Sequence, residues 1–235
     1  MLKLLKVDKD YKSNISIYGK KDGVLALLLF LIIITLYAIL GILNNKVNFI
    51  HKNIMMTGCI SNLLMTIITI LFVKFNKQKL STVGLTKGKW ILSIIVGILL
   101  GIFYFYNNYL SRLLEGYHLP SFSKIIFLII YFFLVALCEE IVFRGYFGTR
   151  ITGLVKNRYL SILLTGILFV LMHFPYRMIA YKMSLYDLFI SNSGWILNLL
   201  FFHVVMNFIY SRTNSLYGSI IPHWLSDLGY DILVK

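Results

Sequence analysis

Hydrophobic residues in this chain come in long blocks that are separated by short polar segments. Blocks of about 20 apolar residues are long enough to cross a bilayer, and a backbone in lipid has to satisfy its own hydrogen bonds. The pattern predicts an all-α membrane protein, a polytopic helical bundle with about seven transmembrane helices. The expected spans are 23–43, 54–73, 90–110, 125–147, 159–174, 188–210 and 216–234. The fifth is short and the seventh contains proline and charge, so these two are the ones expected to be tilted, broken or shielded by neighbours.

Lys and Arg are distributed unevenly between the two sides of the predicted spans. Of the 23, sixteen lie in segments on the same side as the N-terminus and seven on the other side. Cytoplasmic loops are the ones enriched in these residues, so the N-terminus is expected in the cytoplasm and the C-terminus outside. The same distribution explains the net charge of +14 without a nucleic-acid partner. The expected location is the cell membrane, with the lipid bilayer as partner, in a bacterium because Ile, Lys and Asn are abundant.

Two regions are expected, a basic cytoplasmic segment at 1–22 and a transmembrane domain at 23–235. The basic segment mixes Leu with Lys, which fits either a helix on the inner headgroup surface or a solvated tail. No internal repeat and no linker rich in Pro, Gly or Ser divides the rest. Cys59 and Cys138 both fall within apolar spans, so a disulfide framework is not indicated.

The most unusual feature is a pair of carboxylates, Glu139 and Glu140, at the end of the apolar run 124–138. Charges within spans cost several kcal/mol by insertion scales, roughly 2.5 to 3.5 each, and usually mark functional sites. Adjacent side chains on a helix diverge by roughly 100°. Glu140 and Arg144 are four residues apart and can form an ion pair on one face, which leaves Glu139 free to act as a general acid or base. A purely structural network of these charges is the alternative.

Three histidines lie in or at the ends of predicted spans. His223 and Asp227 are four residues apart and project from one side of the last span. His203 and Asn207 have the same spacing and compete with them for a catalytic role, although interhelical hydrogen bonding would also explain these two. His173 closes the fifth span. The chain has no HExxH sequence, no GxSxG elbow and no Gly-rich phosphate loop.

Three motifs in this order resemble the CAAX-protease and bacteriocin-processing family of intramembrane peptidases (CPBP, also called Abi). EEIVFRG at 139–145 is similar to the family's EExxxR, FVLMH at 169–173 to its FxxxH, and HWLSD at 223–227 to its HxxxN/D. The stretch SRTNSLYGSIIPH at 211–223 also resembles the family's approach to its last histidine, which favours His223 over His203. The resemblance covers about 80–230.

The resemblance implies that Glu139 and His173 activate a water molecule, while His223 and Asp227 stabilise the oxyanion and Arg144 positions Glu140. Many relatives have Asn where this chain has Asp227. An ionised Asp cannot donate a hydrogen bond, so it would have to be protonated, orient His223 or bind a cation.

The metal question and the depth of the site are left open by the sequence. Glu139, His173 and His223 would also suit a zinc site, and a metal-free general-base mechanism fits equally well. Uniform spans would separate Glu139 from His173 in depth. The two can meet only if the fourth helix continues past Arg144 toward residue 150, or if the fifth helix tilts.

Three functions follow as hypotheses. The first is an intramembrane endopeptidase that cuts a peptide or membrane-protein substrate, such as a leader peptide, a bacteriocin precursor or a signalling peptide. The second is a catalytically idle immunity or scaffold protein of the same fold. The third, less favoured because no repeated halves are visible, is a proton-coupled transporter.

Overall fold

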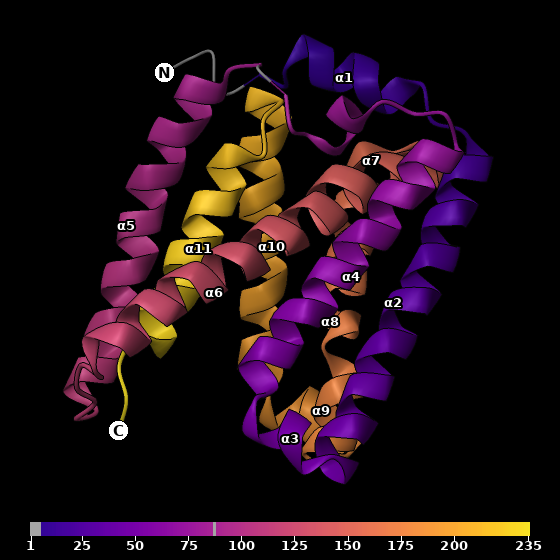
Figure 1. Cartoon of the computed structure of the whole chain (residues 1–235). Coiled ribbons are helices and arrows are strands. Elements are labelled where there is room, and N and C mark those ends of the chain that lie inside the picture. The colour runs from indigo at the N-terminus through magenta and orange to yellow at the C-terminus, as the bar shows by residue number, and fades with distance from the viewer. Residues whose placement is uncertain (1–5, 87) are drawn as a thin grey trace.

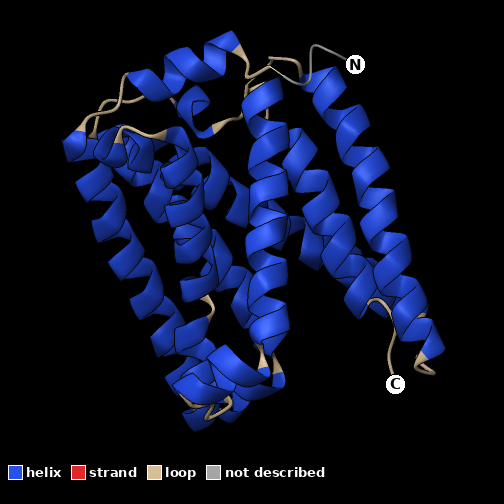
Figure 2. Cartoon of the chain, turned by 180° about the vertical axis from the view of Figure 1, so that it is seen from behind, coloured by secondary structure: helices blue, strands red, loops and turns tan. Residues whose placement is uncertain are grey.

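The computed structural model describes residues 6–86 and 88–235. Every regular element in that part of the chain is a helix, and no strand is assigned there (Figure 2). This confirms the expected helical bundle. The α-helices are α1 (Lys9–Ser16), α2 (Lys20–Lys46), α3 (Asn48–Lys52), α4 (Ile54–Phe75), α5 (Trp90–Leu114), α6 (Phe122–Glu140), α7 (Gly148–Val155), α8 (Arg158–Met172), α9 (Phe174–Ala180), α10 (Ser193–Thr213) and α11 (Tyr217–Asp231). A 3₁₀-helix, η2 (Leu80–Val83), and two π-helices, η3 (Ile141–Phe147) and η4 (Asp187–Ser191), complete them. Residues 1–5 of the predicted basic segment, and Lys87, lie outside the described residues.

Six described segments are long and apolar enough to cross a membrane. They contain five of the seven expected spans and most of a sixth, 188–210, whose first residues lie in η4 instead. The six segments are Lys20–Lys46, Ile54–Phe75, Trp90–Leu114, Phe122–Val155, Arg158–Ala180 and Ser193–Thr213. The chain is therefore a multi-pass membrane protein. The seventh expected span is α11, which has only 15 residues with Pro222 inside them. It lies within the bundle beside α5 (Figure 1), which shields its polar side chains from lipid.

The fourth span is longer than expected and crosses the bundle obliquely (Figure 1). Instead of ending at residue 147, the helical segment runs without a break from Phe122 to Val155, over 34 residues. The π-helix η3 follows Glu140 directly. Such π-helical turns within α-helices frequently occur at functional sites. The continuation past Arg144 is one of the two conditions under which Glu139 and His173 could come together.

Arg150 fastens the segment between α4 and α5 onto this long helix. Its guanidinium is fully buried, and it donates hydrogen bonds to the Thr82 carbonyl at 3.1 Å and to Gln78 Oε1 at 2.7 Å. The rings of Tyr18 and Tyr146 lie 4.4 and 4.5 Å from its Cζ. The expected fourth span ends at residue 147, which would leave Arg150 in a loop. Arg150 is instead a buried cross-link, because α7 continues the helix and turns this side chain inward.

The N-terminal helix α1 lies across the end of the bundle (Figure 1), with Tyr11 and Ile15 buried. Asp8 caps the helix, accepting a hydrogen bond from the backbone N–H of Asp10 at 2.9 Å, and pairs with Lys89 at 2.6 Å. Burial raises the pKa of Asp8, but the hydrogen bond and charge of Lys89, with backbone hydrogen bonds, lower it below its usual range. The described part of the basic segment is thus packed onto the bundle and is not a solvated tail.

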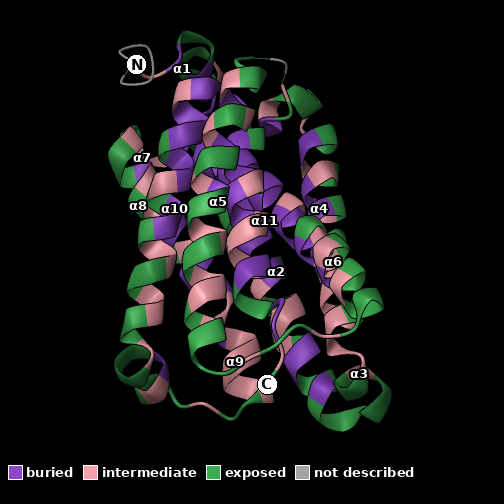
Figure 3. Ribbon diagram, turned by 90° about the vertical axis from the view of Figure 1, so that its left-hand side faces the viewer, coloured by how far each residue is buried: buried purple, intermediate pink, exposed green. Residues whose placement is uncertain are grey.

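Buried residues are concentrated where the helices face one another (Figure 3). Many of the exposed residues are large and apolar. On α5, for example, Leu99 and Phe103 are 67% and 60% exposed. Exposed apolar surface on this scale suits contact with lipid. Small residues let α5 and α11 approach closely, since a Cβ atom added to Gly97 would lie 3.0 Å from the Gly218 Cα. This contact sets the position of His223 and Asp227.

Gly145 provides a test of how the segment carrying η2 closes over η3. A Cβ atom at this position would lie 2.2 Å from the Val83 carbonyl oxygen. Gly145→Ala should therefore destabilise the protein by about 1–3 kcal/mol, because the backbone has to move. Thermal unfolding in detergent measures this. Gly194→Ala is the control, since nothing lies within 4 Å of its added Cβ. Equal melting temperatures for the two variants would contradict the tight contact.

Candidate active site

The two adjacent glutamates have different surroundings. Glu140 is fully buried, and its Oε1 lies 3.0 Å from Arg144 Nη1, which is also fully buried. The Arg144 guanidinium packs over the ring of Phe169, with its Cζ 4.4 Å from the ring centroid. A buried carboxylate needs an opposite charge nearby, because its removal from water costs roughly several kcal/mol even after the protein has relaxed around it. The expected ion pair between Glu140 and Arg144 is confirmed.

His223 links the two glutamates. Its Nδ1 lies 2.7 Å from Glu140 Oε1, and because an ionised carboxylate only accepts, Nδ1 is the donor. The other ring nitrogen, Nε2, lies 3.8 Å from Glu139 Oε2 and 3.5 Å from Asp227 Oδ2. The contact between α6 and α11 through Glu140 was not anticipated from the sequence, in which the two residues are 83 positions apart. It turns Nε2 toward Glu139 and Asp227.

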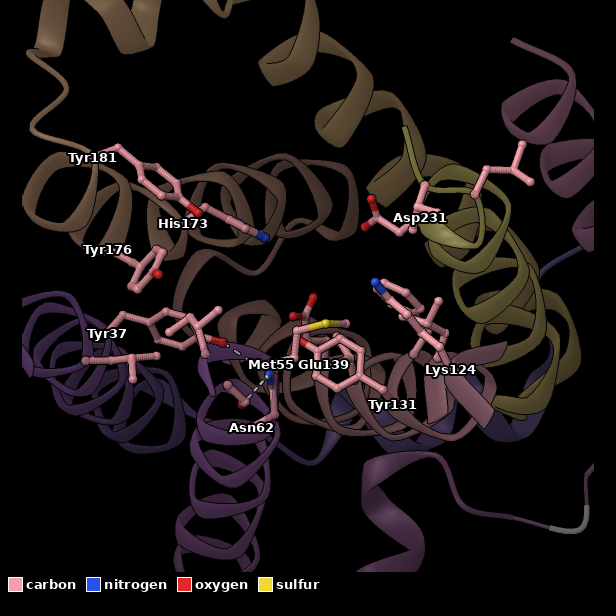
Figure 4. Close-up of a pocket in the computed structure, with 18 residues that line it drawn as sticks. Tyr37, Met55, Asn62, Lys124, Tyr131, Glu139, His173, Tyr176, Tyr181 and Asp231 are labelled. Atoms are coloured by element: carbon pink, nitrogen blue, oxygen red, sulfur yellow. Dashed lines mark hydrogen bonds between the residues drawn. The ribbon is translucent and has the colours of Figure 1, made fainter. Parts of the chain in front are cut away.

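Glu139 lines a cavity of about 520 Å³. Its side chain is 8% exposed, and the carboxylate points into the same space as the imidazole of His173 (Figure 4). The cavity wall is built from α2, α4, α6 and α9, from His173 between α8 and α9, and from the end of α11 with the residues that follow it. Tyr37, Asn62, Lys124 and Asp231 are among its polar or charged members. The structure therefore gives Glu139 what Glu140 lacks, which is room for a water molecule or a substrate group.

His173 lies where the fifth span changes direction, between α8 and α9. Pro175 follows two residues later, within the first turn of α9. The His173 Nδ1 atom lies 2.8 Å from the Phe169 carbonyl oxygen, which can only accept, so Nδ1 carries the proton. In the neutral ring this leaves Nε2 as an acceptor. His173 and Glu139 thus line the same cavity, which is necessary if both are to act on one water molecule.

A second cavity of about 500 Å³ is lined by His223, which does not line the first cavity. Asp227 and Phe169 also line the second cavity, together with Arg177 and Trp195. Asp231 is common to both cavities. Asp231 belongs to none of the motifs found in the sequence. Glu139 and His173 therefore line the first cavity, and His223 and Asp227 line the second.

Other residues of the site were missed from the sequence. Asn62 lies in an apolar span and accepts a hydrogen bond from the Tyr37 hydroxyl at 3.4 Å, on the wall of the first cavity. Polar side chains within spans are a recognisable signal, and Asn62 in the stretch ISNLLM carried it. Lys124 gave no such signal, because one Lys at a span end is ordinary.

His203 and Asn207 form a separate buried pair. The Asn207 side-chain nitrogen lies 2.8 Å from His203 Nε2, and both residues are at most 1% exposed. Neither lines the two cavities described above. His203 packs against Gly166, whose added Cβ would lie 3.1 Å from the imidazole Cδ2. Of the two histidine pairs with this spacing, only His223 and Asp227 face Glu139.

The candidate zinc ligands are not gathered into one cluster in the described residues. Across residues 6–86 and 88–235, no group of three His, Cys, Asp or Glu residues is placed to hold a metal ion. In the zinc set left open by the sequence, His173 and His223 each use Nδ1 in a hydrogen bond within the protein, an arrangement that histidines ligating a metal through Nε2 also have.

Residues 121–229 match the family model described as Type II CAAX prenyl endopeptidase Rce1-like. The matched part begins at the first residue before α6 and ends within α11, so it contains Glu139, Glu140, Arg144, His173, His203, His223 and Asp227. The chain therefore carries an Rce1-like domain of the CPBP family, a family of CAAX-type intramembrane endopeptidases. A family of membrane proteases has the lipid bilayer and a peptide substrate as its general partners.

Comparison with curated proteins and with solved structures found no match. The family match starts later than the expected limit near residue 80, so α5 lies outside it although α5 packs on α11.

The buried ion pair predicts an asymmetric response to mutation. Arg144→Met should destabilise the protein by about 3–5 kcal/mol, because it leaves the Glu140 charge buried with less compensation. The double variant Arg144→Met, Glu140→Gln should recover much of this loss, since both charges are removed. Thermal unfolding of the three proteins in the same detergent measures the difference. A single variant as stable as the parent would contradict the assigned charge pair.

Proposed function

We propose that this protein is an intramembrane endopeptidase in which Glu139 is the general base. The observation that carries the proposal is the contrast between the two glutamates. Glu140 is held by Arg144 and His223, whereas Glu139 faces a cavity shared with His173 and lies beside His223. The Rce1-like domain supports this reaction class.

In the proposed reaction, Glu139 takes a proton from water while the water oxygen attacks the scissile carbonyl carbon. The neutral imidazole of His173, with Nδ1–H donated to the Phe169 carbonyl, accepts from the same water through Nε2 and orients it. The proton then passes to the amide nitrogen as the C–N bond breaks. General acid–base catalysis of this kind contributes about 10²- to 10⁴-fold.

His223 is the proposed oxyanion donor. When both ring nitrogens carry protons, Nδ1–H is held by Glu140 and Nε2–H is free to donate to the developing negative charge. Preorganised donors in a water-poor site are usually the largest single contribution to catalysis. Asp227, 3.5 Å from Nε2, orients this nitrogen in the resting state. Among the roles left open for Asp227 by the sequence, orientation of His223 is the one we propose.

The substrate is proposed to be a peptide or a membrane-associated protein, and peptide precursors are the first class to test. A library of quenched fluorescent peptides, incubated with the purified protein in lipid, would yield a cleaved sequence. With that peptide, Glu139→Gln and His173→Ala should each lower kcat by about 10²- to 10⁴-fold while leaving the melting temperature close to that of the parent.

Matched controls are available on the same chain. Glu115→Gln removes a carboxylate that pairs with Arg112 at the end of α5, and His51→Ala removes an exposed imidazole of α3. Both should cleave like the parent. Cleavage at parental rates by Glu139→Gln would contradict the assignment. A host phenotype that survives Glu139→Gln would instead favour an immunity or scaffold function.

Chelation tests the metal-free form of the mechanism. Cleavage of the same peptide should be unchanged after treatment with a strong zinc chelator, because the described side chains do not assemble a three-ligand site. Metal analysis of the purified protein should run in parallel. Loss of activity that is restored by stoichiometric zinc would overturn this part of the proposal.

A further inference from the structure

The two ends of the bundle are built from different segments of the chain. One end carries α1, the segment between α4 and α5, and the turns between α7 and α8 and between α10 and α11 (Figure 1). We call this the N-terminal end. The opposite end, here the C-terminal end, carries α3, the turn between α5 and α6, the segment from α9 to η4 and the chain terminus.

The N-terminal end has more Lys and Arg residues than the C-terminal end. In the described residues the C-terminal end holds Lys46, Lys52, Arg112, Lys124, Arg177, Lys182 and Lys235. All other described Lys residues and all other Arg residues except the buried Arg144 belong to segments of the N-terminal end. Because Lys and Arg are enriched on the cytoplasmic side of membrane proteins, this bias assigns the N-terminal end to the cytoplasm.

Both cavities reach the C-terminal end. The first is lined by Ile54 and Lys124, in the first turns of α4 and α6, and by Tyr181 and Val234 beyond the ends of α9 and α11. The second is lined by Arg177 of α9 and by Tyr230, one residue before the end of α11. Glu139 and His223 lie deeper in the bundle. The cavities therefore lead from the C-terminal end inward to the site.

Toward the N-terminal end the site is closed by packed side chains. Phe143, Tyr146 and Phe147 of η3 are at most 2% exposed, and Gly145 is in contact with the Val83 backbone. Beyond them Arg150 ties η2 to the long helix. A peptide could not pass through this layer without separating η2 from η3.

We propose that the substrate reaches Glu139 from the membrane face opposite the N-terminus. The substrate class is then an exported peptide or an extracytoplasmic segment of a membrane protein. That the entering molecule is a substrate rests on the proposed function. The side of the membrane to which the cavity opens does not depend on that function. From Lys124 to Glu139 the helical rise amounts to about 22 Å, which about six or seven extended residues would cover. The substrate therefore needs a flexible stretch of that length.

Cysteine accessibility tests this arrangement independently of activity. Met55→Cys in the cavity wall, Ser121→Cys at the C-terminal end and Lys79→Cys at the N-terminal end would be expressed in a bacterium. A sulfonated, membrane-impermeant maleimide would be applied to spheroplasts and to inverted vesicles. We expect Met55→Cys and Ser121→Cys to react at least 10-fold faster in spheroplasts, and Lys79→Cys to react only in inverted vesicles.

The parent protein, which has free Cys59 and Cys138, gives the background labelling. Reaction of Lys79→Cys in spheroplasts, or of Met55→Cys only in inverted vesicles, would overturn the proposed access side. Failure of Met55→Cys to react in either preparation would also overturn it, because a cavity closed to a small polar reagent cannot admit a peptide.

A second measurement connects access with cleavage. Labelling of Met55→Cys from the spheroplast side should abolish cleavage, whereas labelling of Met56→Cys, whose side chain is exposed and absent from the cavity wall, should leave it unchanged. Correct labelling without any peptidase activity would reject the proposed function and leave the access side intact. Cleavage that persists after complete labelling of Met55→Cys would reject this cavity as the route of the substrate.

Discussion

The structure depends on one buried charge network, which joins Glu140 to Arg144 on the long helix and to His223 on α11. Each group alone would be costly in a membrane interior, because an unpaired buried charge loses its hydration without compensation. Together they fix the rotation of two helices relative to each other. Glu140 lies 3.0 Å from Arg144 and 2.7 Å from His223. A rotation of either helix would break one of these contacts and leave a buried charge without its partner.

This network also accounts for the difference between two chemically identical neighbours. The same helix turn that directs Glu140 into the network directs Glu139 away from it, toward the cavity that His173 shares. One glutamate is therefore held in a buried network, and the carboxylate of the other faces open space. In the π-helix that follows, Arg144 pairs with Glu140, and the missing side chain of Gly145 leaves room for the backbone of Val83.

The cavities give the bundle a direction. Both lead to the end that is poor in Lys and Arg, while the opposite end is closed by aromatic side chains and by the cross-link through Arg150. The short helix α11 is not among the six segments long enough to span the membrane, but it carries His223 and Asp227. It lies between α5, α6 and α10, where His223 and Asp227 are protected from lipid.

The sequence by itself determined the membrane class, six of the spans, the separation of positive charge and the pairing of Glu140 with Arg144. These are local properties, set by hydropathy over about 20 residues and by helical spacing over four. The choice of His223 over His203 also came from the sequence, through the resemblance of residues 211–223. Only the tertiary structure decided that His223 bonds Glu140, that Asp231 and Asn62 line the cavity and that Arg150 is buried. Those contacts join residues far apart in the chain, and they depend on helix tilt and rotation, which no local pattern specifies.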